Sequence, residues 1–323
     1  MPCRGPLVAT ILTMVLPLSG GEASPYPEAG RGVVELLRLA DVVLLGERHW
    51  SRHDADLRNA LVSDPEFASV SGTVLVEFGN SLYQDILDRY LIDLDSVPDA
   101  ELYKVWRSTT TTSGAWDSPL YEEFYRTVRK VNETRPWESR VRVVAMGLPV
   151  DWDRVEVWED LLLYGHRGWC FTRMIEREAL TPGKKAVVIV GYGHFLRVDD
   201  EMDEDYNVVR RLEALHSDKS IRVVLPFALK DGSPGRIPGA VGKTDGPVLL
   251  PASAEPFGAW SSDEFFYGGV GSLRYQADGL IYHGPEPDQE VGIPEDYYKK
   301  HPAYAAELER RRSLKPRLPG SYN

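Results

Sequence analysis

Two glutamates and two histidines of this chain stand at the ends of short apolar runs that have the composition of buried strands. Glu47 and His49 follow the first run, after Gly46, which we expect to permit a sharp turn. Glu77 ends the second run, and His194 follows a later one. Ligands of open parallel sheets bind at the carboxyl ends of the strands, where the following loops converge. We therefore expect these four side chains to form one polar site at one edge of a sheet.

A histidine beside carboxylates supports two kinds of chemistry. The imidazole can act as a general base that activates water, while a second histidine orients the substrate or donates a proton. The same groups can instead bind a divalent metal such as Mn or Zn and leave a coordination position open for water. We interpret all four residues as catalytic, and the candidate metal ligands among them are His49, Glu77 and His194. The spacing does not decide between the two chemistries.

Four further residues are candidates for binding substrate or supporting the site. Tyr192 and Arg197 flank the second histidine, and the arginine could hold an anionic intermediate. Asp151 follows another apolar run at the same expected edge. His53 lies four residues after the first histidine and on a helix would share its face. The remaining histidines are interpreted as ordinary loop or helix residues: His166, His216, His283 and His301.

Several classes of protein are disfavoured. The chain has no Gly-x-Ser-x-Gly turn and no glycine-rich phosphate loop, which argues against a serine hydrolase and against a nucleotide cofactor. Its formal net charge is −12, with 49 acidic against 37 basic residues. A nucleic-acid partner requires a basic face, so we expect none.

Apolar runs rich in β-branched residues predict the strands that position these side chains. The predicted strands span residues 42–45, 73–76, 141–145, 186–190 and 221–225, with 278–282 as a candidate last strand. The predicted helices span residues 54–61, 82–91, 121–132, 158–163, 171–180, 206–216 and 302–312. Strands that alternate with helices predict an α/β fold with a central, mainly parallel β-sheet flanked by helices.

Two long stretches interrupt this alternation. Residues 85–137, between the second and third predicted strands, are predicted to form a helical insertion, because one crossover needs far fewer residues. Within it, residues 97–117 carry two tryptophans and are a candidate lid over the site. Residues 230–271 are rich in glycine and proline and are predicted to be irregular. The C-terminal extension, residues 285–323, is also expected to be irregular outside its one predicted helix.

The amino terminus has the features of a secretory signal peptide. Arg4 precedes an almost wholly apolar run over residues 6–18, and small residues follow up to Ala23. Cleavage near Ala23 would remove residues 1–23 and leave residues 24–323 as a single secreted or periplasmic domain without a stable membrane span. An uncleaved anchor and a buried first helix are the alternatives.

Three stretches resemble the erythromycin esterase/ChaN-like group, within the broader Tiki/TraB superfamily. They are Val-Leu-Leu-Gly-Glu-Arg-His over residues 43–49, the acid that ends the second strand, and Gly-Tyr-Gly-His-Phe-Leu-Arg over residues 191–197. The similarity covers most of the chain after the predicted signal. It implies a parallel-sheet core with the site at the strand ends.

The resemblance implies more than one activity. Esterase-like members hydrolyse a lactone ester with a histidine base and a supporting glutamate, without metal. Tiki-like members are proteases that use paired motifs with a divalent metal, and ChaN-like members bind haem. Carried over to this chain, His49 would be the base, Glu47 and Glu77 its supports or metal ligands, and His194 the second histidine.

Our leading hypothesis is a secreted hydrolase whose His/Glu site activates water to cleave an ester or amide of a small-molecule or peptide substrate, with or without a metal. One alternative is a haem- or ligand-binding protein of the ChaN type, in which the histidines and Tyr192 hold the ligand. Another is a non-catalytic relative with a decayed site, since Gly147 and Gly168 stand where close bacterial relatives are expected to have acidic residues. The cofactor stays open between none, a divalent metal such as Mn or Zn, and haem.

Overall fold

The computed structural model describes residues 26–198, 207–233, 235–242, 244 and 246–315. The predicted signal peptide with its cleavage position lies outside the described residues, as does the first residue of the helix predicted at 206–216. Within the described ranges, no helix combines the length and the apolar character needed to cross a membrane.

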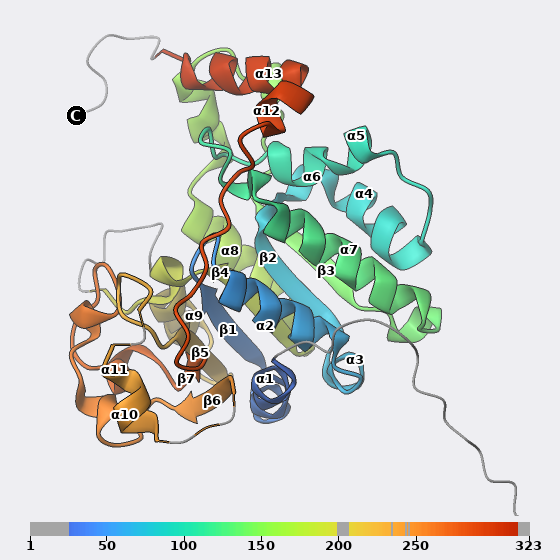
Figure 1. Ribbon diagram of the computed structural model, residues 1–323. Coiled ribbons are helices and arrows are strands. Elements are labelled where there is room, and N and C mark those ends of the chain that lie inside the picture. The colour runs from blue at the N-terminus through green and yellow to red at the C-terminus, as the bar shows by residue number, and fades with distance from the viewer. Residues whose placement is uncertain (1–25, 199–206, 234, 243, 245, 316–323) are drawn as a thin grey trace, which may run out of the picture.

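A seven-stranded sheet forms the centre of the protein, with helices packed on both faces (Figure 1). The strand order is β3-β2-β4-β1-β5-β7-β6, and only β6 runs antiparallel to its neighbour. The strands are β1 (Val42–Glu47), β2 (Thr73–Asn80), β3 (Arg142–Gly147), β4 (Ala186–Gly191), β5 (Ile221–Pro226), β6 (Val248–Pro251) and β7 (Gly279–Tyr282). The predicted α/β fold with a mainly parallel sheet is confirmed.

The central strands are apolar throughout because both of their faces are covered. In β1, Val43 and Leu45 point into one hydrophobic core, whereas Val42 and Leu44 point into the other. Alternate residues of a strand face opposite sides of the sheet, so a strand between two helical layers needs an unbroken apolar run. This requirement explains why the runs in the sequence located the strands well.

The helices divide between the two faces. The core on the side of α1, α2, α4 and α7 is separated by the sheet from the core on the side of α8 and α9 (Figure 1). The longer helices are α1 (Pro27–Leu39), α2 (Arg52–Ser63), α7 (Pro119–Glu133), α8 (Arg167–Ile175), α9 (Val208–Leu215) and α13 (Pro302–Arg312). The shorter helices are α3 (Phe67–Val70), α4 (Gln84–Asp88), α5 (Asp99–Leu102), α6 (Lys104–Arg107), α10 (Ile237–Val241), α11 (Leu273–Gln276) and α12 (Tyr297–Lys300).

Helix α1 was not predicted, because its first turns carry proline and two glycines. Proline is tolerated in the first turn of a helix, where its missing N–H has no partner to lose. Gly30 lies so close to α2 that an added Cβ would come within 3.2 Å of the backbone nitrogen of Leu61. The glycine therefore permits close packing of the two helices, and Val33 and Leu37 bury the same face.

Two other local predictions were wrong. Residues 158–163 were predicted to form an α-helix, but they lie in a 3-10 helix, Trp158–Tyr164, whose Leu162 and Leu163 are exposed. A 3-10 helix has poorer hydrogen-bond geometry and is used in short pieces. The segment 230–271 was predicted to be irregular, but it contains α10 and the antiparallel strand β6.

Candidate active site

Glu47, His49, Glu77 and His194 line one cavity of about 230 Å³ at the carboxyl edge of the sheet. The strands that carry them are neighbours, because β4 lies between β1 and β2 and pairs with both. Tyr192 and Arg167 complete the polar wall together with Gly191 and Gly193. The folded chain thus brings all four principal candidates together.

Gly46 has a different role from the one that the sequence indicated. We expected it to form a sharp turn, but it lies inside β1, where it pairs with Val190, and the strand continues to Glu47. A Cβ on Gly46 would come within 2.9 Å of Leu225 Cδ2 and 3.0 Å of Tyr192 Cα. Gly46 is therefore required for close packing under the site. The turn itself comes later, at Trp50, whose φ of 68° is left-handed.

The imidazole of His49 lies between two buried carboxylates. Its Nδ1 is 3.4 Å from Oε1 of Glu47, and its Nε2 is 4.0 Å from Oε2 of Glu77. The ring of Trp116 packs edge-on against it, with ring centroids 4.8 Å apart. Burial lowers the pKa of His49, but the hydrogen bond that its ring donates to Glu47 and the charge of Glu77 outweigh this, so its pKa lies above the ordinary value. The side chain is still 39% exposed, which leaves it open to the cavity.

Glu47 forms a buried ion pair with an arginine that sequence reasoning missed. Arg58 Nη1 donates to Oε2 of Glu47 at 2.8 Å, and Nη2 donates to the carbonyl of Leu120 at 2.8 Å. Both side chains are almost fully buried, with exposures of 2% and 3%. The guanidinium also lies over the rings of Phe78 and Tyr121, 5.3 and 4.9 Å from their centroids. Removing one member of such a pair costs about 3–5 kcal/mol, because the other charge stays buried without a partner.

Glu77 is the second buried carboxylate and has partners of its own. Its Oε2 accepts a hydrogen bond from the Gly191 N–H at 2.8 Å, and its Oε1 is 3.4 Å from Nε2 of His194 and 3.8 Å from Nη1 of Arg167. Burial raises the pKa of Glu77, but the charge of His194 and the hydrogen bonds outweigh this and keep its pKa well below the ordinary value. Glu77 is therefore a fixed negative charge in the cavity wall.

Two site residues gave little signal in the sequence. Arg58 lies on the buried face of α2, eleven residues after Glu47. This separation in the sequence does not indicate that the two side chains are partners. Arg167 starts α8, far from any of the apolar runs that marked the strand ends. Only the fold places both guanidinium groups beside the glutamates.

Tyr192 lies between this cavity and a wider one. It lines the His49 cavity and also a neighbouring cavity of about 320 Å³, to which Arg48, Lys230 and Tyr267 contribute. His49 is likewise shared by both. The two hollows therefore form adjoining compartments that are both lined by charged groups, and the larger one also has two tyrosines in its wall.

Arg197 does not point into the site. Its backbone N–H donates to Gln276 Oε1, and its guanidinium donates to the carbonyls of Tyr275 and Gln276 and pairs with Glu213. The short distance from His194 in the sequence was misleading, because the chain turns away after the 3-10 helix Tyr192–Phe195. Arg197 ties the loop after β4 to the segment before β7.

Asp151 also lies away from the four principal residues. Its side chain accepts a hydrogen bond from the Asp153 N–H as the cap of the 3-10 helix Trp152–Arg154, and it pairs with Arg154 at 3.0 Å. It lines neither of the two cavities at His49. The third strand ends on the far side of β2 from β4, which explains its separation from the site.

His53 belongs to a separate buried cluster. Its ring stacks on that of His283 at 5.2 Å, and its Nδ1 is 3.6 Å from Asp288. His283 in turn lies 2.9 Å from Oδ1 of Asp54, whose pKa is raised by burial but lowered further by the hydrogen bond and charge of His283. His283 was interpreted as an ordinary residue, but it is buried in this cluster. Helix α2 begins at residue 52, so the turn before it separates His53 from the face of His49.

The geometry does not match a metal centre. Over the described ranges, no group of three or more His, Cys, Asp and Glu side chains has the mutual arrangement needed to hold a metal ion. The proposed ligands instead satisfy one another, because Glu77 faces His49 on one side and His194 on the other. We therefore derive no reaction step through a metal.

The two glycines that raised the question of a decayed site differ in their surroundings. A Cβ on Gly147 would come within 2.5 Å of the carbonyl oxygen of Gly79, so this backbone excludes any larger residue there. Gly168 is buried in the first turn of α8, next to Arg167. Neither glycine lines the cavity at His49.

Comparisons with known proteins show similarity in fold alone. No protein-family model matches the chain, and no curated protein matches it by sequence. A crystal structure of a Bacillus cereus protein superposes with a TM-score of 0.54 and 11% identity, covering 84% of this chain and 95% of that one. A structure described as cofacial haem binding to ChaN of Campylobacter jejuni gives a TM-score of 0.38 and 13% identity, covering 79% of this chain and 91% of that one. A structure of the type III effector HopBA1 gives a TM-score of 0.34 and 12% identity, covering 64% of this chain and 86% of that one.

Proposed function

We propose that this protein is a hydrolase in which His49 activates a water molecule for attack on an ester or amide carbonyl. The observation that carries the proposal is the position of the imidazole, which is open to the cavity and lies between the buried carboxylates of Glu47 and Glu77. A histidine oriented by one carboxylate, with its second nitrogen directed into a polar cavity, is the arrangement that general-base catalysis requires.

The roles of the surrounding groups follow from their contacts. If Nδ1 of His49 donates its proton to Glu47, Nε2 is the tautomeric nitrogen that can accept a proton from water. Arg58 pairs with the other oxygen of Glu47 and so holds this carboxylate in place beside Nδ1 of His49. Arg167 and His194 line the same cavity and supply N–H groups for the negative charge that develops on the carbonyl oxygen.

The two cavities indicate the size and character of the substrate. The compartment beside the glutamates is small and charged, so it suits a carbonyl group and a water molecule but not a bulky side group. The wider compartment, with Tyr192 and Tyr267 in its walls, is then the place for the remainder of a small molecule or of a peptide.

The proposal is tested with the variant His49→Gln, which keeps a polar side chain of similar length and removes the base. We expect hydrolysis of a panel of ester and peptide substrates by the purified wild-type protein, and loss of turnover in the variant by about 100-fold or more, since general bases contribute 10²–10⁴-fold. The matched control is His216→Gln, because His216 pairs with Glu176 outside the cavity. A wild-type protein without turnover on the panel, or a variant as active as the control, would contradict the proposal.

A haem-type ligand is the second candidate, and the wider cavity is the observation that favours it. His49 and Tyr192, which offer imidazole and phenol groups of the kind that ligate haem iron, both line that cavity. Lys230 lies in the same wall, as does Arg48, which pairs with Asp288 at 3.1 Å. The bound group would supply redox or transport chemistry, while these side chains hold it. A Soret band that persists after gel filtration, and that is lost in Tyr192→Phe or His49→Gln, would favour this function over hydrolysis.

A further inference from the structure

A segment near the C-terminus crosses the molecule and pairs with the turn that follows β1. We call residues 285–312 the C-terminal strap, and Figure 1 shows it passing from the end of β7 to α12 and α13. The Val291 N–H donates to the carbonyl of Trp50 at 2.8 Å, and the Arg52 N–H donates to the carbonyl of Gln289 at 2.9 Å. The strap therefore forms a short antiparallel pair with the backbone just beyond His49.

The strap also encloses a buried carboxylate on the other side of the site. Tyrosine hydroxyls of α12 and α13 donate to Asp117, from Tyr298 at 3.0 Å, Tyr304 at 3.2 Å and Tyr297 at 3.4 Å. Asp117 is 2% exposed, so these bonds form in a region of low dielectric, where they are stronger than in water. Three donors on one carboxylate leave it little freedom to move.

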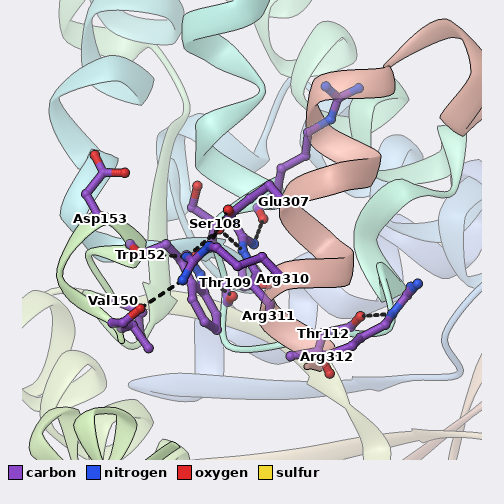
Figure 2. A network of polar contacts seen from close by, with 12 residues as sticks. Ser108, Thr109, Thr112, Val150, Trp152, Asp153, Glu307, Arg310, Arg311 and Arg312 are labelled. Carbon is purple, nitrogen blue, oxygen red and sulfur yellow. Dashed lines mark hydrogen bonds and ion pairs between the residues drawn. The ribbon is translucent and has the colours of Figure 1, made fainter. Parts of the chain in front are cut away.

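Helix α13 binds the backbone that leads to this carboxylate. Arg311 donates to the carbonyl of Arg107 at 2.6 Å. Arg312 donates to the carbonyl of Thr112 at 2.8 Å (Figure 2). The guanidinium of Arg311 also lies 4.3 Å from the ring centroid of Trp152. The strap thus holds the segment 107–117 at several points along its length.

This segment ends against the proposed base. Trp116, the residue before Asp117, packs edge-on against His49, and the indole N–H of Trp50 donates to the carbonyl of Ala115 at 2.7 Å. The ring of His49 has Trp116 on one side and the open cavity on the other. The orientation of the His49 ring therefore depends on the position of the Trp116 side chain.

We propose that Asp117 is a positioning residue through which the C-terminal strap sets the orientation of His49. The strap holds the Asp117 carboxylate, Asp117 fixes the adjacent Trp116, and the indole prevents the imidazole from rotating away from Glu47 and Glu77. The catalytic meaning of this orientation rests on the proposed hydrolase function, whereas the mechanical coupling between strap and imidazole does not.

The coupling is tested in the full chain with the double variant Tyr298→Phe/Tyr304→Phe, which removes two of the hydroxyl donors but keeps the rings. The measurement is the rate at which diethyl pyrocarbonate modifies His49, followed by mass spectrometry of the peptides, with His216 as the internal reference. We expect modification of His49 to accelerate several-fold in the double variant. Tyr275→Phe is the matched control, because it loses a hydroxyl contact remote from the site.

A second measurement separates positioning from a general loss of structure. If the hydrolase function holds, the double variant should lose kcat by about tenfold to a hundredfold with little change in KM, because a misplacement of about 1 Å can lower rates by that much. Circular dichroism must show that the double variant is folded. If it is not, the same measurements are made on the single variants Tyr298→Phe and Tyr304→Phe. An unchanged rate of His49 modification in the folded variants would overturn the positioning role of Asp117. Accelerated modification in a protein without any turnover would instead uphold the coupling and reject the hydrolase.

Discussion

At the scale of single residues, the site depends on two glutamates that have different partners. Glu47 is neutralised by Arg58 and so can accept a hydrogen bond from His49 without leaving a lone charge in the core. Glu77 is stabilised by a backbone N–H and by His194, on the opposite side of the cavity. The two carboxylates therefore act on the imidazole from both sides, one by direct hydrogen bonding and the other by charge.

The raised pKa of His49 has a measurable consequence. A general base must be neutral, so a pKa above the ordinary value of about 6.5 keeps more of the imidazole protonated near neutrality. We expect kcat/KM to rise with pH through a midpoint above 6.5, and the Glu47→Gln variant to lower that midpoint, because Glu47 supplies two of the three contributions that raise the pKa, including the largest. NMR titration of the His49 imidazole measures the same pKa without need of turnover. A midpoint that is at or below 6.5, or that is unchanged in the variant, would contradict this account.

At the scale of elements, two glycines allow the ends of β1 and β4 to carry the site. A Cβ on Gly191 would come within 2.8 Å of Cε1 and Nε2 of His49, whereas a Cβ on Gly46 would meet Leu225 and the backbone of Tyr192. The first close approach involves the proposed base, and the second involves the core. The same chemical change at the two positions therefore has different expected effects.

We predict that Gly191→Ala mainly impairs activity and that Gly46→Ala mainly impairs stability. The added methyl at 191 must displace the His49 ring, while the methyl at 46 overpacks the core, which typically lowers the unfolding free energy by about 1–3 kcal/mol. Urea denaturation and steady-state kinetics on both variants check this difference. Gly239→Ala in α10 is the control, since nothing lies within 4 Å of a Cβ there. If Gly191→Ala and Gly46→Ala lose activity equally and have similar unfolding free energies, this prediction is wrong.

At the scale of the whole molecule, buried carboxylates link stability to pH. Burial alone would raise the pKa of Glu77 and of Asp54, but their cationic partners outweigh burial and hold both pKa values below the ordinary range. A carboxylate with a depressed pKa contributes stability that is present above its pKa in the unfolded chain and is lost as the pH falls toward its pKa in the folded protein.

We expect the unfolding free energy to decrease as the pH is lowered below about 4, where the carboxylates of the unfolded chain begin to bind protons. The Asp54→Asn variant should be less stable at pH 7 and should show a flatter profile between pH 5 and 3, because one of the linked groups is gone. Urea denaturation across that range provides the measurement. Glu138→Gln is the control at an exposed position, and a profile for Asp54→Asn parallel to that of the wild type would refute the linkage.

The sequence by itself determined the parallel strands and the edge of the sheet where four polar residues line one cavity, but not the antiparallel strand β6. It could do so because strands buried on both faces must be continuously apolar, and because a polar residue directly after such a run has no place except the sheet edge. The end of β1 at Glu47 follows from this local pattern, whereas the predicted end at Glu77 was wrong, because β2 continues to Asn80. The same logic did not extend to Arg197, since six residues beyond the end of β4 the direction of the chain is no longer set by the strand.

Only the tertiary structure decided which partners these residues have. Strand β4 lies between β1 and β2, a sheet order that no local pattern contains, and it places His194 against Glu77. Arg58 reaches Glu47 from a helix, and the strap reaches Asp117 across about 180 residues of sequence. Pairings of this kind arise because buried charges must find partners wherever packing brings them, and burial is a property of the folded molecule.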